Sequence, residues 1–445
     1  MNAVILPLCL ILVLGFFRVN VIFSLIISSI LSGLLGGMEL STIIELFNTG
    51  LGKKAYIALS YAMLGAFAVS LSHSGITNFA SKKVHGLCAI ETDNKDNILF
   101  KLKVIILGSL LVMAVLSQNL IPIHIAFIPI VVPPLLSSMN LIKLDRRTVV
   151  CVLIFGLVCT YTVIPVGFGK VFLNDILLGN LKKYGLQADL SDVINAMLFP
   201  AAGMFIGLLV AVFLSYAKPR HYVSNLDSEK SIASIAQPRK KYIIFACFAI
   251  VFSSLIQIIY DHSMVFGALA GYVIISFSGA LKKEKHNNLV SQGFNMMSLL
   301  AFTMLASSGF AEVLQATGEI GNLSTFLVDS FGQNNKLLIS FFMLLFGLLL
   351  TTGIGSSFST IPIIAAIYIP ICIDFNFSLF STIVLIGTAT VLGDAGSPVS
   401  EVTLGTTFSL NTDDQHEHFY ETVLPAFIHF TVPLFICGWI AANYF

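Results

Sequence analysis

The 445-residue sequence contains little charge: only 11% of its residues are Asp, Glu, Lys or Arg, whereas 56% are hydrophobic. No Lys or Arg occurs from Leu337 to Phe445. The mean hydropathy is +0.92, and soluble domains carry roughly a quarter charged residues, so this composition excludes a water-soluble globular protein. The sequence predicts an all-α polytopic membrane protein.

Motifs for enzymes and metal centres are missing as well. The seven cysteines form no Cys-x-x-Cys pair and no Cys/His group with metal-ligand spacing. A nucleotide-binding loop and a nucleophile–base arrangement are absent, and the longest polar stretch is 218–241. We therefore expect no enzyme, no cofactor and no nucleic-acid partner. The expected partners are the lipid bilayer and a small cation.

The apolar start of the chain, residues 3–17, lacks the basic region and the small-residue cleavage site of a signal peptide. We expect it to remain as the first helix. About eleven to thirteen spans are predicted from runs near the roughly 20 residues that a crossing helix needs. They are 3–17, 21–38, 55–72, 100–118, 149–168, 195–217, 241–258, 263–281, 295–311, 337–352, 379–392 and 423–443.

Two further segments, 121–136 and 357–373, are short or interrupted by Gly and Pro. Such segments favour re-entrant or broken helices over simple crossings. Pro133 lies in the first of them. We expect both to form hairpins.

Residues 218–241 lie near the midpoint, and similar segments recur on either side of them at separations of 233 to 243 residues. Segment 21–24 resembles 264–267, segment 130–133 resembles 367–370, Pro165 corresponds to Pro398, and Asn78 corresponds to Glu312. We infer an internal duplication. The expected domains are a first transmembrane repeat at 1–217, a cytoplasmic linker at 218–241 and a second transmembrane repeat at 242–445.

Basic residues concentrate in the 82–103 loop, in the 218–241 linker and in the 282–285 loop. If loops alternate sides, the positive-inside rule makes that face cytoplasmic. Loop 82–103 then corresponds to the acidic loop 312–335 on the opposite face. We therefore expect two inverted-topology repeats, an architecture of secondary transporters.

The run Gly393-Asp394-Ala395-Gly396-Ser397-Pro398-Val399-Ser400-Glu401 follows a long apolar segment. Carboxylates, hydroxyl groups and helix breakers at membrane depth suggest an ion site, because Na⁺ prefers oxygen ligands. We expect Asp394, Glu401 and Glu312 to bind a cation or a proton. The expected coordinating residues are Ser356, Ser357, Ser359, Thr360, Thr390, Ser397, Ser400, Thr403, Asn78 and His124. The expected helix breakers are Gly353, Gly355, Gly393, Gly396, Pro398, Pro133 and Pro165.

Each of these residues also has a plainer interpretation. Small and hydroxyl residues let transmembrane helices pack closely, Asp394 could cap a helix, and Glu401 and Glu312 could face water. His124 could be a satisfied polar group in a packed hairpin. The segment with Asp413, Asp414, His416 and His418 matches no standard metal spacing, and we expect a solvated loop.

The N-terminal segments Arg18-Val19-Asn20-Val21, Gly36-Gly37 and Gly50-Leu51-Gly52 resemble the N-terminal region of the bacterial Na⁺/H⁺ antiporter-type family of the ion transporter superfamily. The run from Gly393 to Thr403 is similar to the Gly-Asp-x-x-Ser-Pro-x-Ser-Asp-x-Thr motif of such antiporters, with Glu401 in place of Asp. The first repeat keeps no carboxylate in Ile164-Pro165-Val166-Gly167. The resemblance implies an inner-membrane protein with inverted repeats that works by alternating access, and homodimers are common among such proteins.

Two transport hypotheses follow. In the first, Na⁺/H⁺ antiport, Asp394 binds Na⁺ and a proton in alternation. In the second, Na⁺- or H⁺-coupled uptake of a small solute such as an amino acid, the cation binds near Asp394. Some proteins that resemble this branch are regarded as amino acid permeases. A channel or a membrane scaffold is disfavoured, because no repeated ring of pore-lining charges is present.

Overall fold

A computed structural model shows the chain as a bundle of helices. It describes residues 2–17, 19–75, 95–120, 128–222, 239–260, 263–281, 286–320, 335–398 and 400–444, together with 322, 325, 326 and 329. Asn78, His124 and most of the 218–241 linker lie outside these described residues. Within the described ranges the regular structure is helical, and no strand occurs.

The elements follow one another along the chain with several short π and 3₁₀ segments between the α-helices. They are α1 (Asn2–Phe16), α2 (Val21–Leu35), α3 (Leu40–His73), α5 (Lys95–Asn119), α6 (Ile128–Leu141), α7 (Arg146–Ile154), η2 (Phe155–Cys159), η3 (Thr160–Thr162), α8 (Phe168–Lys170), η4 (Val171–Leu178), α9 (Gly179–Lys183), α10 (Leu190–Val210), η5 (Ala211–Ser215), α12 (Lys240–Ile259), α13 (Met264–Ser278), α14 (His286–Ala316), α16 (Lys336–Ile354), α17 (Ser357–Asp374), α18 (Leu379–Gly396), α19 (Glu401–Leu410), η7 (Phe419–Val423), α20 (Leu424–Ala426), η8 (Phe427–Thr431) and α21 (Val432–Tyr444).

Eight helices or helix runs of the described chain are long and apolar enough to cross a membrane, and α2 and α13 are shorter apolar helices. Helices suit this solvent because they satisfy their backbone hydrogen bonds internally. The segment 357–373, expected to be a hairpin, is instead the single helix α17. The interruption lies just before it, at Gly355 and Ser356, where Gly355 adopts a left-handed conformation with φ +74°.

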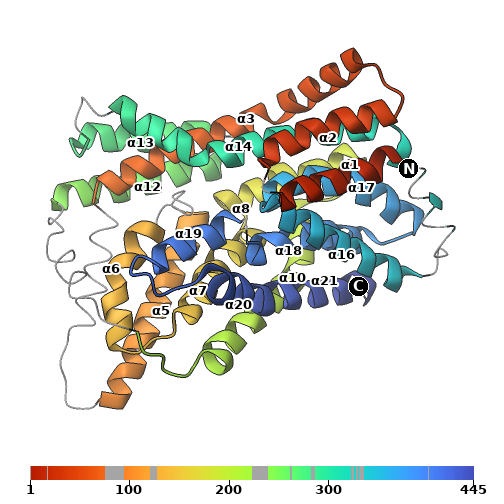
Figure 1. Cartoon of the computed structure of the whole chain (residues 1–445). Coiled ribbons are helices and arrows are strands. Elements are labelled where there is room, and N and C mark those ends of the chain that lie inside the picture. Colours follow the sequence, from red (N-terminus) through yellow and green to blue (C-terminus); the bar gives the residue numbers. More distant parts are fainter. Residues whose placement is uncertain are drawn as a thin grey trace.

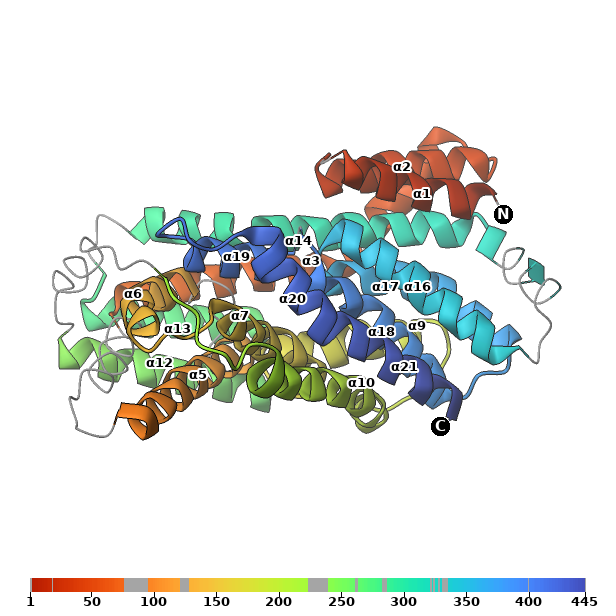
Figure 2. The ribbon, with the colours of Figure 1, turned by 60° about the horizontal axis from the view of Figure 1, so that its bottom comes forward.

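The helices form two layers. In Figure 1, α2, α3, α13 and α14 lie along the top of the molecule, and α10, α16, α18 and α21 lie below them. Helix α3 packs against α14 and α13, whereas α18 packs against α16, α17 and α21. Figure 2 shows α1 and α2 on the outer side of α14.

The two longest of the described helices, α3 and α14, cross antiparallel at paired glycines. A methyl group added to Gly50 would lie 2.5 Å from the carbonyl oxygen of Ser308, and one added to Gly65 would lie 2.1 Å from that of Gly293. The two helices therefore touch backbone to backbone at both ends of the contact. Small residues permit such close packing of membrane helices.

Matching backbone features recur in the two halves. Lys143 and Asn376 both have φ +53°, an uncommon conformation for residues other than glycine. Each follows a helix and precedes a helix cap, Asp145 in the first half and Ser378 in the second. These positions are 233 residues apart in the sequence, the same separation as Pro165 and Pro398.

Helices α3 and α14 are each followed by a glycine with positive φ, Gly75 and Gly318. These glycines are 243 residues apart, which is also the separation between the first residues of α2 and α13. This separation places Glu312 opposite Val69. The sequence comparison instead paired Glu312 with Asn78, nine residues further along, and Asn78 lies outside the described residues.

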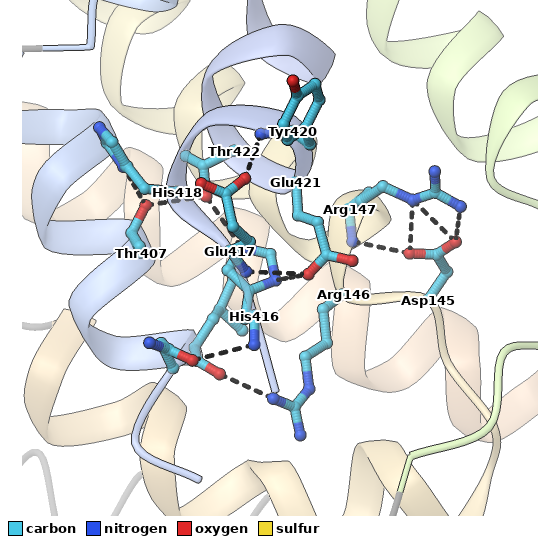
Figure 3. A network of polar contacts seen from close by, with 12 residues as sticks. Asp145, Arg146, Arg147, Thr407, His416, Glu417, His418, Tyr420, Glu421 and Thr422 are labelled. Carbon is cyan, nitrogen blue, oxygen red and sulfur yellow. Dashed lines mark hydrogen bonds and ion pairs between the residues drawn. The ribbon is translucent and has the colours of Figure 1, made fainter. Parts of the chain in front are cut away.

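A polar network joins the start of α7 to the chain after α19 (Figure 3). The guanidinium of Arg146, whose side chain is fully buried, donates to Asp413 at 2.5 and 2.6 Å and to the carbonyl of Leu410 at 2.8 Å. Arg147 pairs with Asp145 in its own turn, at 2.6 Å, and is 34% exposed. Arg220 pairs with Glu421. The network therefore attaches the segment after α19, in the second half of the chain, to the first half.

His416 belongs to this network and is 2% exposed, so the expectation of a solvated loop is wrong for this residue. Its Nε2 lies 2.8 Å from the hydroxyl of Thr422, and its Nδ1 lies 3.3 Å from the carboxylate of Glu421. Burial lowers the pKa of His416 in spite of the Glu421 carboxylate, and Arg146 lowers it further. The Arg146–Asp413 pair contributes to the burial, since it holds this polar segment against the start of α7.

The glycine crossing predicts a position-specific effect of alanine. Gly65→Ala should lower the melting temperature of the purified protein by several degrees, because the new methyl group would push against the Gly293 carbonyl. Gly52→Ala is the control, since nothing lies within 4 Å of its added methyl group in the same helix. The melting temperatures are measured by size-exclusion chromatography after heating. Equal melting temperatures of the two variants would contradict the close crossing.

Arg146 should matter more to stability than its neighbour. Arg146→Gln leaves Asp413 without its buried partner and should destabilise the protein by about 3–5 kcal/mol. Arg147→Gln removes a partly exposed pair within one turn and should cost about 1 kcal/mol or less. Thermal denaturation of the two variants in the same detergent measures the difference, and a larger loss for Arg147→Gln would refute this account of the network.

Candidate functional site

Asp394 lies near the end of α18 and is 7% exposed. The helix ends at Gly396 and the chain becomes helical again at Glu401. Proline explains the break, since Pro398 has no N–H to donate and disfavours helical geometry at Ser397 before it. Ser400 then caps α19, because its hydroxyl accepts from the backbone N–H of Val402 at 3.2 Å.

Three hydroxyl groups surround the Asp394 carboxylate. Tyr161 of η3 donates to Oδ2 at 2.6 Å, and Ser357 at the start of α17 donates to the same oxygen at 2.5 Å. The hydroxyl oxygens of Tyr161 and Ser357 are 2.5 Å apart. Ser400 donates to Oδ1 at 3.2 Å and to the Asp394 carbonyl at 2.8 Å. Elements from both halves of the chain therefore converge on one carboxylate.

No basic side chain of the described chain forms an ion pair with Asp394; the described ion pairs lie elsewhere. A buried carboxylate without a counter-charge is costly, and hydroxyl donors offset only part of that cost. The site is stabilised when a proton or a small cation neutralises the carboxylate. The hydroxyl oxygens of Tyr161, Ser357 and Ser400 are available as ligands for such a cation.

The other candidate hydroxyls mostly bond to backbone carbonyl groups. Ser397 donates to Thr352 at 2.8 Å, and Thr403 donates to Ser397 at 2.6 Å. Ser359 donates to the hydroxyl of Ser356 at 3.2 Å. Thr360 donates to the Ser357 carbonyl at 3.0 Å, and Thr390 donates to Gly387 within α18 at 2.8 Å. Among the candidate hydroxyls, those of Ser357 and Ser400 are therefore bonded directly to the carboxylate.

Two glycines let neighbouring segments approach the break. A methyl group on Gly393 would lie 2.2 Å from the Thr351 carbonyl carbon, and one on Gly396 would lie 2.5 Å from the Thr431 hydroxyl. Gly353 lies inside α16, two residues before the left-handed Gly355. The structure thus uses Gly393 and Gly396 for close packing and Gly355 for a turn.

Glu401 is the first residue of α19 and is partly buried. Its carboxylate makes no hydrogen bond or ion pair with another described residue. Pro398 is exposed, and its carbonyl accepts from His418 at 2.9 Å. That bond fixes the loop between Asp394 and Glu401 to the C-terminal segment.

Aromatic rings close the site on the side of the first half. Tyr161 packs against Phe358 and Phe172 with ring centroids 5.1 and 4.9 Å apart. Phe168 contacts Phe358 and also stacks on Tyr61 of α3. These five side chains are buried. They shield the carboxylate from bulk water, which strengthens electrostatic interactions inside the site.

Glu312 does not join this site. Its carboxylate pairs with Lys53 of α3 at 2.5 Å and with Lys183 of α9 at 2.9 Å, so it links helices of the two layers. Pro133 lies inside α6, and Pro165 lies in the interruption between η3 and α8. Asn78 and His124 fall outside the described residues.

Sequence reasoning missed Tyr161, the main partner of Asp394 from the first half. The two residues are 233 positions apart, the separation shared by Pro165 and Pro398, so the duplication itself could have pointed to Tyr161. It also missed Asp175 of η4, which accepts from the Tyr56 hydroxyl at 2.8 Å. Asn119 was missed too. Its buried Oδ1 accepts no hydrogen bond within the described chain, although its Nδ2 donates to Thr160 at 2.8 Å.

Comparison with known proteins identifies the family. A family model described as the Na⁺/H⁺ antiporter family matches residues 152–439. The chain belongs to this family. A second model, described as a Na⁺-H⁺ antiporter family, matches residues 2–88 of this family member. The two matches leave residues 89–151 between them unmatched.

Full-length relatives of this Na⁺/H⁺ antiporter family member occur in several bacteria. An uncharacterised membrane protein of Vibrio parahaemolyticus is 47% identical over 99% of both chains. One of Haemophilus influenzae is 44% identical over 100% of this chain and 99% of that protein. The proposed amino acid transporter YuiF of Bacillus subtilis is 40% identical over 99% of both chains.

Two solved transporters share the fold. The YdaH transporter of Alcanivorax borkumensis has a TM-score of 0.57 at 11% identity, over 91% of this chain and 88% of that one. MtrF of Neisseria gonorrhoeae, described with a class of antimetabolite efflux pumps, has a TM-score of 0.53 at 13% identity, over 90% and 83%. The family and the fold agree that this antiporter-family chain is a multi-pass secondary transporter rather than an enzyme.

The site geometry predicts different roles for two buried hydroxyls in the second half. Ser357→Ala removes a donor to the carboxylate and should raise the Na⁺ concentration for half-maximal transport about tenfold, the size expected for a hydrogen bond to a charged group. Thr390→Ala removes a hydroxyl that bonds within α18 and should leave this concentration unchanged. Transport assays in proteoliposomes over a range of Na⁺ concentrations compare them, and equal effects would favour simple packing roles.

Proposed function

We propose that the protein exchanges Na⁺ for protons by alternating access, with Asp394 as the shared binding group. The observation that carries this proposal is the buried Asp394 carboxylate, bonded to three hydroxyl groups and lacking a basic partner in the described chain. One carboxylate can hold a Na⁺ ion or a proton but not both. Competition for that group would couple the two fluxes.

The cost of burying bare charge explains why exchange would be coupled. Between two accessible states, the site must pass through a form closed to water. In that form an unneutralised Asp394 would be a buried charge without compensation. The transporter would therefore change conformation only with Na⁺ or a proton bound. Glu401, partly buried at the start of α19, is a second carboxylate available to a proton.

We further propose that the two halves are inverted repeats. Gly50 contacts the segment at Ser308, and Gly65 contacts Gly293, which are the crosswise contacts that a two-fold axis produces. The equivalent helices α3 and α14 run antiparallel, so an axis relating two such membrane-crossing helices would lie in the membrane plane. This arrangement supports a site between the repeats at membrane depth. By the positive-inside rule, the face that carries the basic loops would be the cytoplasmic face, which favours a location in the inner membrane.

A second candidate function is cation-coupled uptake of an amino acid. The full-length identity of 40% to YuiF, a proposed amino acid transporter, favours it. In this mechanism the Asp394 site would bind the coupling Na⁺ or proton, and the solute would bind elsewhere in the protein. The two candidates share the cation site and differ in whether a solute moves with the ion.

Proteoliposomes that contain the purified protein and a pH-sensitive dye separate these candidates. A Na⁺ gradient alone should move protons if the protein is a Na⁺/H⁺ antiporter. Gradient-driven uptake of one labelled amino acid without a proton signal would instead support the second candidate. Absence of both signals, with protein shown to be correctly inserted, would argue against both.

Asp394→Asn should abolish Na⁺-dependent transport, with a residual rate below about 1% of wild type, because an amide neither takes up a proton nor neutralises Na⁺. The variant should still fold, since an amide oxygen can accept from Tyr161 and Ser357. Asp374→Asn is the matched control, because Asp374 is exposed at the end of α17. Wild-type transport by the Asp394→Asn protein would remove Asp394 from the mechanism.

A further inference from the structure

Two histidines after α19 are joined by a continuous series of close polar contacts (Figure 3). Nδ1 of His418 lies 2.7 Å from the hydroxyl of Thr407 in α19, and that hydroxyl lies 2.9 Å from the hydroxyl of Thr422 in η7. The Thr422 hydroxyl in turn lies 2.8 Å from Nε2 of His416. These four side chains form the histidine cluster.

Each end of the histidine cluster meets an oxygen atom that accepts hydrogen bonds and has none to donate. At one end, Nε2 of His418 lies 2.9 Å from the carbonyl oxygen of Pro398, in the second break. At the other end, Nδ1 of His416 lies 3.3 Å from the carboxylate of Glu421, which also pairs with Arg220. The cluster therefore connects the buried ion pairs at the start of α7 with the break beside the Asp394 site.

The histidine cluster needs more protons than its neutral side chains carry. It makes five contacts, three between its members and two at its ends, and each needs one proton between the two atoms. A neutral imidazole carries one ring proton and a hydroxyl carries one, so two histidines and two threonines supply four. One contact would then bring two lone pairs together, whichever tautomers the histidines adopt. The Thr407 hydroxyl also lies 2.9 Å from the Thr403 carbonyl, and this further acceptor adds to the shortage.

One additional proton removes the shortage among the five contacts. An imidazole with both nitrogens protonated donates from both, so every contact then has a donor and an acceptor. Burial lowers the pKa of His416, whereas His418 is partly exposed, so the positive charge is better placed on His418. The two hydroxyls would then donate in turn toward His416, whose Nδ1–H faces Glu421.

The charged groups near the histidine cluster suit a single positive charge. They are Glu421, Asp145, Arg146 and Arg220 around His416, and Glu417 near both histidines. The two arginines oppose a charge on His416. Glu417 is exposed and attracts a charge on His418. One proton on the cluster is therefore favoured over two.

We propose that the histidine cluster is a proton-binding site separate from Asp394, which holds one proton and thereby keeps His418 bonded to the Pro398 carbonyl. When that proton leaves, one contact loses its donor. A carboxylate is a stronger acceptor than a carbonyl, so His416 keeps its N–H toward Glu421 and the Pro398 contact is lost. The second break would thus be held at low pH and released at high pH. This inference goes beyond the proposed exchange and is independent of which ion or solute the protein moves.

The first test follows the proton in the wild-type protein, labelled with ¹⁵N-histidine and reconstituted in lipid nanodiscs. Nitrogen NMR is recorded over about pH 5 to 8, the range in which imidazoles titrate. One histidine should have both ring nitrogens protonated in the lower part of this range, and its signals should be missing from the spectrum of His418→Gln. A His418 that carries a single ring proton throughout would overturn the proposal.

The second test interrupts the histidine cluster at its centre. Thr407→Val leaves three contacts for three protons, so neutral histidines then suffice. The midpoint of proton uptake should fall by about one pH unit, the equivalent of one hydrogen bond to a charged group. Thr407→Ser is the matched control, because it keeps the hydroxyl, and its midpoint should equal that of the wild type. Equal midpoints in the two variants would overturn the shared site.

The third test measures the effect on the second break by amide hydrogen exchange of α19 in nanodiscs, corrected for the intrinsic effect of pH. Protection of α19 in the wild type should fall about fivefold as the pH rises through the midpoint, as expected for loss of one hydrogen bond. His418→Gln should show no fall, because an amide N–H can donate to the Pro398 carbonyl at every pH. Constant protection in the wild type, or the same fall in His418→Gln, would refute the link to the break.

These outcomes are distinguishable from those for the exchange at Asp394, because none of the three tests measures transport. A histidine cluster that takes up no proton would refute this inference and leave the exchange standing. Absence of Na⁺-driven proton movement would refute the exchange and leave a titrating histidine cluster standing.

Discussion

The Asp394 carboxylate lies among three hydroxyl groups, and no basic side chain of the described residues pairs with it. Much of the surrounding structure follows from that buried charge. The break at Ser397 and Pro398 lets Ser400 turn back to the carboxylate, and Gly393 lets α18 press against α16. The aromatic side chains then exclude water, so whatever neutralises Asp394 must be a proton or an ion without its full hydration shell.

Similar backbone turns precede the two breaks. Lys143 and Asn376 have the same φ before α7 and α18, and the helical runs that begin there are interrupted after η3 in the first half and after α18 in the second. Tyr161 and Asp394, which are 233 positions apart in the sequence, meet where the two halves touch. Pairing of equivalent positions is what a two-fold relation between the halves would produce.

The sequence sufficed for features that depend on local composition. Apolar runs predicted the membrane class, and the run from Gly393 to Glu401 predicted a helix break with a buried carboxylate. Features set by distant contacts were not accessible in the same way. Arg146 and Asp413 are 267 residues apart, so the sequence pattern gave no sign that they pair. Without that pair, the pattern around His416 predicted a solvated loop. Pro362 and Pro370 suggested a hairpin, but α17 is nearly all buried, and its packed neighbours allow it to continue through both.

If the two halves are repeats, as we propose, the pairing of Tyr161 with Asp394 would also explain why their sequences differ at these positions. An aspartate in place of Tyr161 would put a second carboxylate within a few ångströms of the first. Two such charges about 3–4 Å apart repel by roughly 4–6 kcal/mol even at an effective dielectric constant of about 20. One of them would then stay protonated and could not take up Na⁺. A tyrosine hydroxyl avoids this repulsion and supplies a donor to the remaining carboxylate. An internal two-fold arrangement would therefore favour a single ionisable carboxylate at its centre.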